Sequence, residues 1–133
     1  MRSLVYLWAL PTTAVGLALG ALALVSGGGV RRRAGTLEFH GGWLGAILAA
    51  TPAGATAMTV GHVILGRHEA GLDRCRSHEL VHVRQAELLG PLFIPAYFAA
   101  SAWAAARGRH LYRDNWFEVD ARRRSEDVTL TDA

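Results

Sequence analysis

The pentapeptide His78-Glu79-Leu80-Val81-His82 carries the clearest chemical signal in this 133-residue chain. Residues four apart on an α-helix project from the same face, so both imidazoles can reach one ion. Zinc suits two neutral imidazoles and a carboxylate, with a fourth position left for water. Glu79 is placed to take a proton from that water and to pass it to a leaving amine. The pentapeptide therefore predicts a hydrolytic zinc centre.

A third protein ligand is expected from the segment that begins at Arg113. Glu118 lies 36 positions after His82, at the start of what we expect to be a second helix. Asp120 is two residues further on and would point about 160° away from Glu118 on a regular helix, so both cannot bind the same ion. We prefer Glu118 as the third ligand over Asp120, His110 and Asp114.

The segment from Asp73 to Leu89 contains no glycine or proline and is compatible with a helix throughout. Asp73 is expected at its N-cap or in its first turn, where the helix dipole favours an acid. Four charged side chains keep this helix in a water-accessible setting and not in lipid: Arg74, Arg76, Arg84 and Glu87.

The motif at His78–His82, followed by Gln85 and a distant Asn115-x-x-Glu118-x-x-Ala121, resembles the gluzincin class of zinc metallopeptidases. It is most similar to the small bacterial membrane-associated members, which have a Gly-Pro-Leu segment after the zinc helix. The resemblance covers about Thr59 to Arg123. It implies that His78, His82 and Glu118 bind one zinc ion, and that Glu79 is the general base and acid. It also implies that an extended peptide substrate adds to a sheet edge formed by Thr59–Leu65.

The chain departs from the gluzincin pattern at two positions. Many gluzincins carry an aspartate four residues after the ligand glutamate, where it orients a histidine, and here that position is Arg122. Their zinc helix usually has an apolar residue two positions after the second histidine, where this chain has Arg84. The residues that orient the zinc ligands are therefore not assigned by the resemblance.

An oxyanion formed during hydrolysis needs a donor aimed at the developing charge. The candidates are Tyr112, His110, Arg113 and His62, and we prefer Tyr112 because it is near Glu118 in the sequence.

The elements that would position these residues suggest an α+β fold. We expect two strands, Thr36–His40 and Thr59–Leu65, joined through a short helical or irregular excursion into a small hairpin. The helix with the two histidines would pack on the second ligand-bearing helix. The result is a small zincin-like domain over residues 31–133.

The first 30 residues are expected to form a membrane anchor. No charged residue occurs from Ser3 to Val30, and the 22 positions Leu4–Val25 are enough to span a bilayer as a helix of roughly 30 Å. The positive charges at Arg31–Arg33 follow this run, whereas a signal peptide carries them in front. The positive-inside rule then predicts one crossing of the cell (inner) membrane, with the domain on the cytoplasmic side.

Association with other macromolecules is constrained by the same composition. Gly16 and Gly20 form a small-xxx-small pair that would let two membrane helices approach closely, as in a homodimer. The net charge of +3 gives no basis for nucleic-acid binding.

A second charge-free run, Leu88–Ala106, is long enough to be another membrane helix. A full crossing there would put Glu118 on the opposite side from the histidines, so no single ion could bind all three. Pro91 and Pro95 also interrupt the run. We therefore expect a helix that packs in the core or dips into the membrane surface, and both alternatives remain open.

Two functions that use zinc fit these observations, and a zinc-free membrane scaffold in which the motif occurs by chance is a third alternative. The first is a membrane-anchored zinc metallopeptidase that hydrolyses peptide bonds through a zinc-activated water. The second is a non-catalytic membrane protein in which a structural zinc ion holds two helices together. The carboxylate of Glu79 favours the first, because a structural site has no use for it. The small size of the domain favours the second, because little room is left for a substrate cleft.

Overall fold

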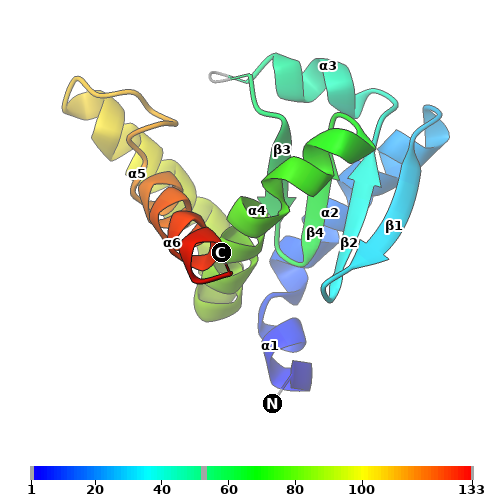
Figure 1. The fold of residues 1–133 in the computed structure, drawn as a ribbon, viewed down its shortest axis with the longest axis horizontal. Helices are drawn as coiled ribbons and strands as arrows, with labels where there is room; N and C mark the ends of the chain where they lie inside the picture. Colours follow the sequence, from blue (N-terminus) through cyan, green and yellow to red (C-terminus); the bar gives the residue numbers. More distant parts are fainter. Residues whose placement is uncertain (1, 52–53, 133) are drawn as a thin grey trace.

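The computed structural model describes residues 2–51 and 54–132 and has an α+β fold (Figure 1). The expected α+β class is confirmed, with a four-stranded mixed sheet in place of a single hairpin. The elements follow in the order α1 (Arg2–Trp8), α2 (Leu10–Val25), β1 (Gly29–Arg33), β2 (Thr36–His40), α3 (Leu44–Ala49), β3 (Ala57–Val60), β4 (Val63–Gly66), α4 (Glu69–Leu89), the 3-10 turn η1 (Gly90–Leu92), α5 (Phe93–Ala106) and α6 (Trp116–Asp132).

The sheet has the strand order β1-β2-β4-β3, so β3 lies at an edge. β2 pairs antiparallel with β1 and parallel with β4, while β3 and β4 form an antiparallel hairpin. The prediction of a strand at Thr36–His40 is confirmed. The prediction of one continuous strand at Thr59–Leu65 is wrong, because the chain turns at Gly61 and His62. Gly61 has φ +67°, and a Cβ there would lie 2.5 Å from Thr13 Oγ1.

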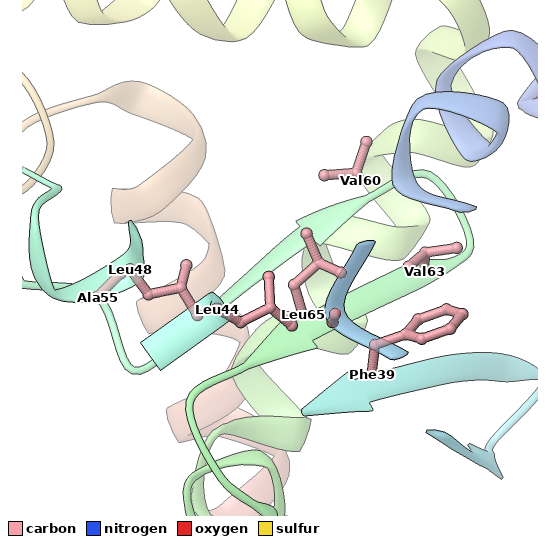
Figure 2. Packing of buried hydrophobic residues seen from close by; sticks show 8 residues of the cluster. Phe39, Leu44, Leu48, Ala55, Val60, Val63 and Leu65 are labelled. Carbon is pink, nitrogen blue, oxygen red and sulfur yellow. The ribbon is translucent and has the colours of Figure 1, made fainter. Parts of the chain in front are cut away.

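Helices cover both faces of the sheet. On one face, α2 and α3 enclose a cluster of buried apolar side chains from the strands (Figure 2). On the other face, Leu72 and Val83 of α4 pack against Ile64 of β4. α4 extends beyond the sheet, and α6 packs along this part of it (Figure 1). The helix that carries the two histidines is therefore held between the sheet and α6.

The glycine face of α2 is occupied by the sheet. A Cβ at Gly16 would lie 2.7 Å from the Val60 carbonyl oxygen, and one at Gly20 would lie 2.5 Å from the Phe39 ring. The close approach that these glycines predict is made within the chain, so this face is not available for the expected homodimer.

The expected N-terminal crossing is also corrected. The run that we expected to cross is divided at Ala9 into α1 and α2, and α2 packs on the sheet as part of the same fold. Among the residues that the structure describes, one segment is long and apolar enough to cross a membrane by length and composition, but it is Glu69–Ala106, in the middle of the chain. This segment is interrupted at Gly90, where φ is +56°.

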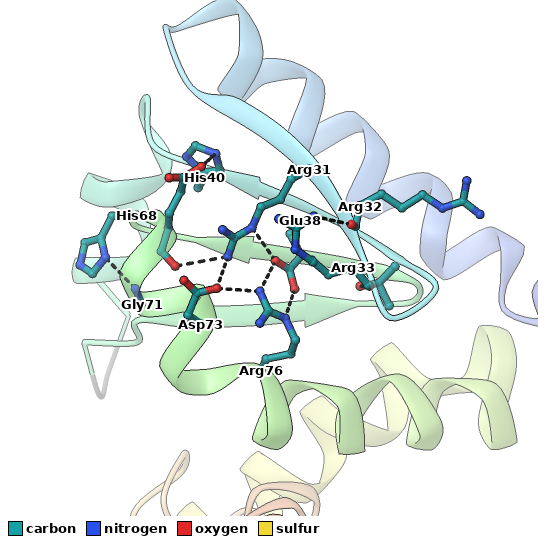
Figure 3. A network of polar contacts seen from close by, with 11 residues as sticks. Arg31, Arg32, Arg33, Glu38, His40, His68, Gly71, Asp73 and Arg76 are labelled. Atoms are coloured by element: carbon teal, nitrogen blue, oxygen red, sulfur yellow. Dashed lines mark hydrogen bonds and ion pairs between the residues drawn. The ribbon is translucent and has the colours of Figure 1, made fainter.

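α4 begins earlier than expected. His68 is its N-cap, and the His68 Nδ1 atom accepts a hydrogen bond from the Gly71 backbone N–H at 2.8 Å. Asp73 is therefore not at the helix start. It lies inside the helix and accepts hydrogen bonds from Arg31 and Arg76, which also hold the buried carboxylate of Glu38 (Figure 3). This group of four charges fixes α4 to β1 and β2.

Candidate metal centre

α4 and α6 bring His78, His82 and Glu118 together. One ligand atom from each lies within 4.8 Å of the others, which is close enough for one metal ion to bind all three. Glu118 Oε1 is 2.6 Å from His82 Nε2, and Glu118 Oε2 is 3.4 Å from His78 Nε2. The two histidines expected on one helical face do share it, with ring centroids 5.0 Å apart.

Asn115 sets the position of Glu118. Its side-chain oxygen accepts a hydrogen bond from the Phe117 N–H at 2.8 Å, and this caps the first turn of α6. The Asn115 amide group donates to the Tyr97 carbonyl oxygen and to Ser101 Oγ on α5. Glu118 is thus in the first turn of a helix whose start is fixed to α5.

Gln85 orients the His82 ring. The Gln85 amide nitrogen donates to the Phe117 carbonyl oxygen at 3.1 Å and to Asp120 Oδ2 at 2.9 Å, so the Gln85 amide oxygen faces His82 Nδ1 at 2.8 Å. An amide oxygen only accepts, and His82 Nδ1 must therefore carry the hydrogen. His82 Nε2 is left to face Glu118, which is the arrangement of a metal-binding histidine.

The buried Nε2 atom of His82 has no hydrogen-bond partner of good geometry in the described part of the chain. When the ring is neutral, its lone pair faces a carboxylate oxygen only 2.6 Å away, and two lone pairs at this distance repel each other. A cation between them removes the repulsion, either a proton or a metal ion. The three residues therefore fit a metal ion.

Burial and charge shift the pKa values in opposite directions at this site. Burial alone would raise the pKa of Glu118, but the neighbouring His78 and His82 lower it to about 2. Burial alone would lower the pKa of His82, but the adjacent carboxylates of Glu118 and Glu79 raise it to about 8. Glu118 is thus held as an anion, and a positive charge is favoured beside it.

Glu79 lies in the interior next to the two histidines. It is 4 % exposed, and Thr59 Oγ1 on the edge strand β3 donates a hydrogen bond to Glu79 Oε2 at 2.5 Å. Burial raises the pKa of Glu79, although His82, Thr59 and His78 act against this. Its carboxyl group is therefore more basic than an exposed glutamate.

Two tyrosines approach Glu118 from different elements. The Tyr97 hydroxyl on α5 donates to Glu118 Oε1 at 3.3 Å. Tyr112 is half-buried, and burial together with the charges of Glu118 and Glu79 raises its pKa. Sequence reasoning proposed Tyr112 and gave Tyr97 no role at the site. Tyr97 and Ser101 are four residues apart and both contact Asn115. This spacing indicates that the Tyr97 side of α5 faces the site only when the fold is known.

The other candidates have different partners. Asp120 accepts from Gln85 and Arg124, as expected for a side chain that points away from the ion. Asp114 accepts from the His110 backbone N–H, and His110 Nδ1 accepts from the Tyr112 and Arg113 backbones. His62 lies in the turn after β3, where its Nε2 is 2.9 Å from Glu87 Oε2.

Comparisons of the chain with models of protein families, with curated proteins and with solved structures found no match. The resemblance to gluzincins rests on the motif residues, and it stays a prediction.

Proposed function

We propose that the chain is a membrane-associated zinc metallopeptidase. The observation that carries this proposal is the position of the buried Glu79 carboxyl beside a His78, His82 and Glu118 group that fits one metal ion. A metal group that only holds helices together does not need an additional buried carboxyl next to it, since burying an acid is costly.

The donor set favours zinc. Two imidazoles and one carboxylate are the ligands of many catalytic zinc sites, in which three protein ligands leave a fourth position open. Sites for magnesium or calcium are built mainly from oxygen ligands. A zinc ion held there supplies a Lewis acid that polarises a peptide carbonyl and acidifies a water molecule.

Glu79 moves the proton during hydrolysis. It accepts a proton from the attacking water as the new carbon–oxygen bond forms. It then gives this proton to the amide nitrogen as the carbon–nitrogen bond breaks, which releases a carboxylic acid and an amine. Its raised pKa suits both roles because the carboxyl group must accept and release a proton near neutral pH. The Thr59 hydroxyl orients the carboxyl group through its hydrogen bond to Oε2.

Tyr112 is the proposed donor to the oxyanion. It is half-buried and close enough to Glu118 and Glu79 for their charges to act on its hydroxyl, and the raised pKa keeps that hydroxyl protonated. Tyr97 already donates to Glu118, so it holds the ligand carboxylate in place.

The substrate is proposed to be an extended peptide. β3 is an edge strand, and Thr59 in it contacts Glu79, so a chain added along β3 would pass the catalytic carboxyl. Addition of a strand to a sheet edge supplies affinity through main-chain hydrogen bonds and leaves the sequence preference to side-chain pockets.

We propose that the protein lies on the cytoplasmic side of the cell membrane. This location does not require the N-terminal crossing that we expected from the sequence. A reporter domain fused after Ala133 should be active only in the cytoplasm. Activity of the reporter only outside the cytoplasm would contradict this side.

The function is tested by Glu79→Gln, which keeps the size of the side chain but removes its basicity. We expect zinc to remain bound and hydrolysis of an unstructured fluorogenic peptide to fall by about 10²–10⁴-fold. Glu69→Gln is the matched control, because Glu69 is an exposed glutamate on the same helix, and it should leave both quantities unchanged.

Two results would contradict the proposal. If the wild-type protein binds zinc but hydrolyses no peptide or unfolded protein, the zinc site is structural. If Glu79→Gln loses its zinc, Glu79 supports the metal site and is not the proton carrier.

A further inference from the structure

α2 has one face on the sheet and one face without a protein partner in the described residues. Its buried positions, among them Gly16 and Gly20, contact the strands. The opposite side exposes a continuous set of large apolar side chains: Leu10, Val15, Leu17, Leu22, Leu24 and Val25. No charged residue interrupts the sequence from Ser3 to Val30. A water-soluble protein rarely exposes so long an apolar face.

α5 repeats this arrangement. Phe93 and Ala104 are buried, and Tyr97 turns inward to Glu118. The outer side of the same segment exposes Phe98 by 67 % and Trp103 by 66 %. α5 is thus fixed to the zinc ligands through one face and exposes aromatic side chains on the other.

α2 and α5 lie on the same side of the molecule in Figure 1. In Figure 1, α4 and α6 are in front, whereas α2 lies behind the sheet and α5 lies behind α6. α2 contacts the η1 turn that leads into α5, where Thr12 Oγ1 donates to the Gly90 carbonyl oxygen. Together the two helices form what we call the apolar face, consisting of the exposed side chains of α2 and α5.

Cationic side chains lie at the border of the apolar face. Arg107, Arg109 and Arg113 follow α5 and are exposed, and the Arg107 guanidinium lies 5.7 Å from the Trp103 ring centroid. Arginine beside tryptophan at the end of an apolar helix suits the headgroup region of a bilayer that contains anionic lipid.

We infer that the apolar face lies on a lipid bilayer with α2 and α5 parallel to the membrane plane. α2 has 16 residues and α5 has 14, so they are about 24 Å and 21 Å long, shorter than the roughly 30 Å hydrocarbon core. Helices of this kind bury one face at the headgroup boundary. The interaction depends on the two helix surfaces and not on zinc chemistry, so it can fail or hold independently of the proposed activity.

Flotation of the full chain with lipid vesicles tests this surface. We expect the protein to float with phosphatidylcholine vesicles that contain phosphatidylglycerol, and to bind more weakly when phosphatidylglycerol is omitted or salt is raised. Leu22→Glu on α2 and Phe98→Glu on α5 should each reduce binding by about tenfold or more, because each removes a large apolar contact. Ala70→Glu adds the same charge to an exposed position of α4, outside the apolar face, and should have little effect.

Folding and orientation need separate measurements. Circular dichroism melting checks that each variant is folded. If a glutamate variant does not fold, the serine variant at the same position, Leu22→Ser or Phe98→Ser, is tested in its place. Orientation is read from fluorescent labels at Leu10→Cys or Val25→Cys, each in a Cys75→Ser background, with quenching by brominated lipids. If α2 lies parallel to the membrane plane, quenching should place both labels at the same shallow depth and on the same side of the bilayer.

Three results would overturn the inference. The first is unchanged vesicle binding by the α2 and α5 variants. The second is labels at the two ends of α2 that reach opposite sides of the bilayer, as a crossing helix requires. The third is a lipid-free dimer that the same variants convert to a monomer, since a second copy of the chain would then cover the apolar face.

Discussion

Two buried carboxylates, Glu38 and Glu118, have different sets of partners. Glu38 is 0 % exposed and Glu118 is 3 % exposed, and both join α4 to another element. Arg31 donates to Glu38 Oε1 at 2.9 Å, and Arg76 donates to both carboxylate oxygens at 2.8 and 2.9 Å (Figure 3). Each oxygen of Glu38 thus has a permanently charged donor.

Glu118 faces two imidazoles instead, and these are neutral or charged according to what is bound to them. His82 Nε2 is 2.6 Å from Glu118 Oε1 without the geometry of a hydrogen bond. The Glu38 group is complete without any ligand, whereas the Glu118 group needs a further cation. We infer that the Glu38 group stabilises the fold, and that the Glu118 group favours the binding of a metal ion.

The largest difference between the groups should appear on removal of the Glu118 charge. Glu118→Gln should reduce bound zinc from one ion per chain to almost none after dialysis, because two histidines alone hold zinc weakly. Metal analysis of the dialysed protein measures this. Glu38→Gln is the control and should keep its zinc. One zinc ion per chain retained in Glu118→Gln would show that the third ligand is a residue other than Glu118.

Stability should respond in the opposite way. Glu38→Gln should lower the free energy of unfolding by about 1–3 kcal/mol, since the two half-buried arginines then keep only the exposed Asp73 as a counter-charge. Chemical denaturation of the metal-free proteins measures the loss. The comparison between the groups fails if Glu118→Gln destabilises the metal-free protein as strongly as Glu38→Gln does.

Gln85 provides a smaller test, because it contacts the ligand His82 and is not itself a ligand. Gln85→Leu should weaken zinc binding by about 10- to 100-fold, since the His82 ring loses the acceptor that fixes its Nδ1 hydrogen. Competition with a chelating dye measures the dissociation constant. An unchanged constant would show that His82 needs no such partner.

The pH dependence of the metal-free protein gives the smallest effect. The pKa of His82 is raised from 6.5 to about 8 in the folded state, so its charged pairing with Glu118 stabilises the fold fully below about pH 6.5. This stabilisation, about 2 kcal/mol at most, is lost as pH rises through 8. Urea unfolding at a series of pH values measures it. Bound zinc should abolish this loss because it replaces the proton, and an identical loss with zinc would contradict that exchange.

Local sequence patterns predicted the parts of the site that depend on helix periodicity. The spacing of His78 and His82 placed them on one face, and the angle between Glu118 and Asp120 correctly separated them. The strand at Thr36–His40 was likewise readable, because glycines follow it directly. These features depend on the geometry of one element, which the sequence determines directly.

Features that depend on contacts between distant elements were not predicted. The charges at Arg31–Arg33 were interpreted as a membrane signal, but Arg31 belongs to a strand and pairs with Glu38. The roles of Tyr97 and Gln85 required the packing of α4, α5 and α6. The turn at Gly61 was missed because apolar residues on both sides suggested one strand, although glycine itself signals a turn.

The capping of α6 by Asn115 makes the chain unequally tolerant of changes in length. One residue inserted between Asn115 and Glu118 would turn the carboxylate by about 100° around the helix axis, away from the histidines. The same insertion between Gly108 and His110 would lie in the exposed connection before the cap and would leave the register of α6 intact. Natural or engineered variants that retain the metal group should therefore differ in length before Asn115 and keep a fixed distance from Asn115 to Glu118.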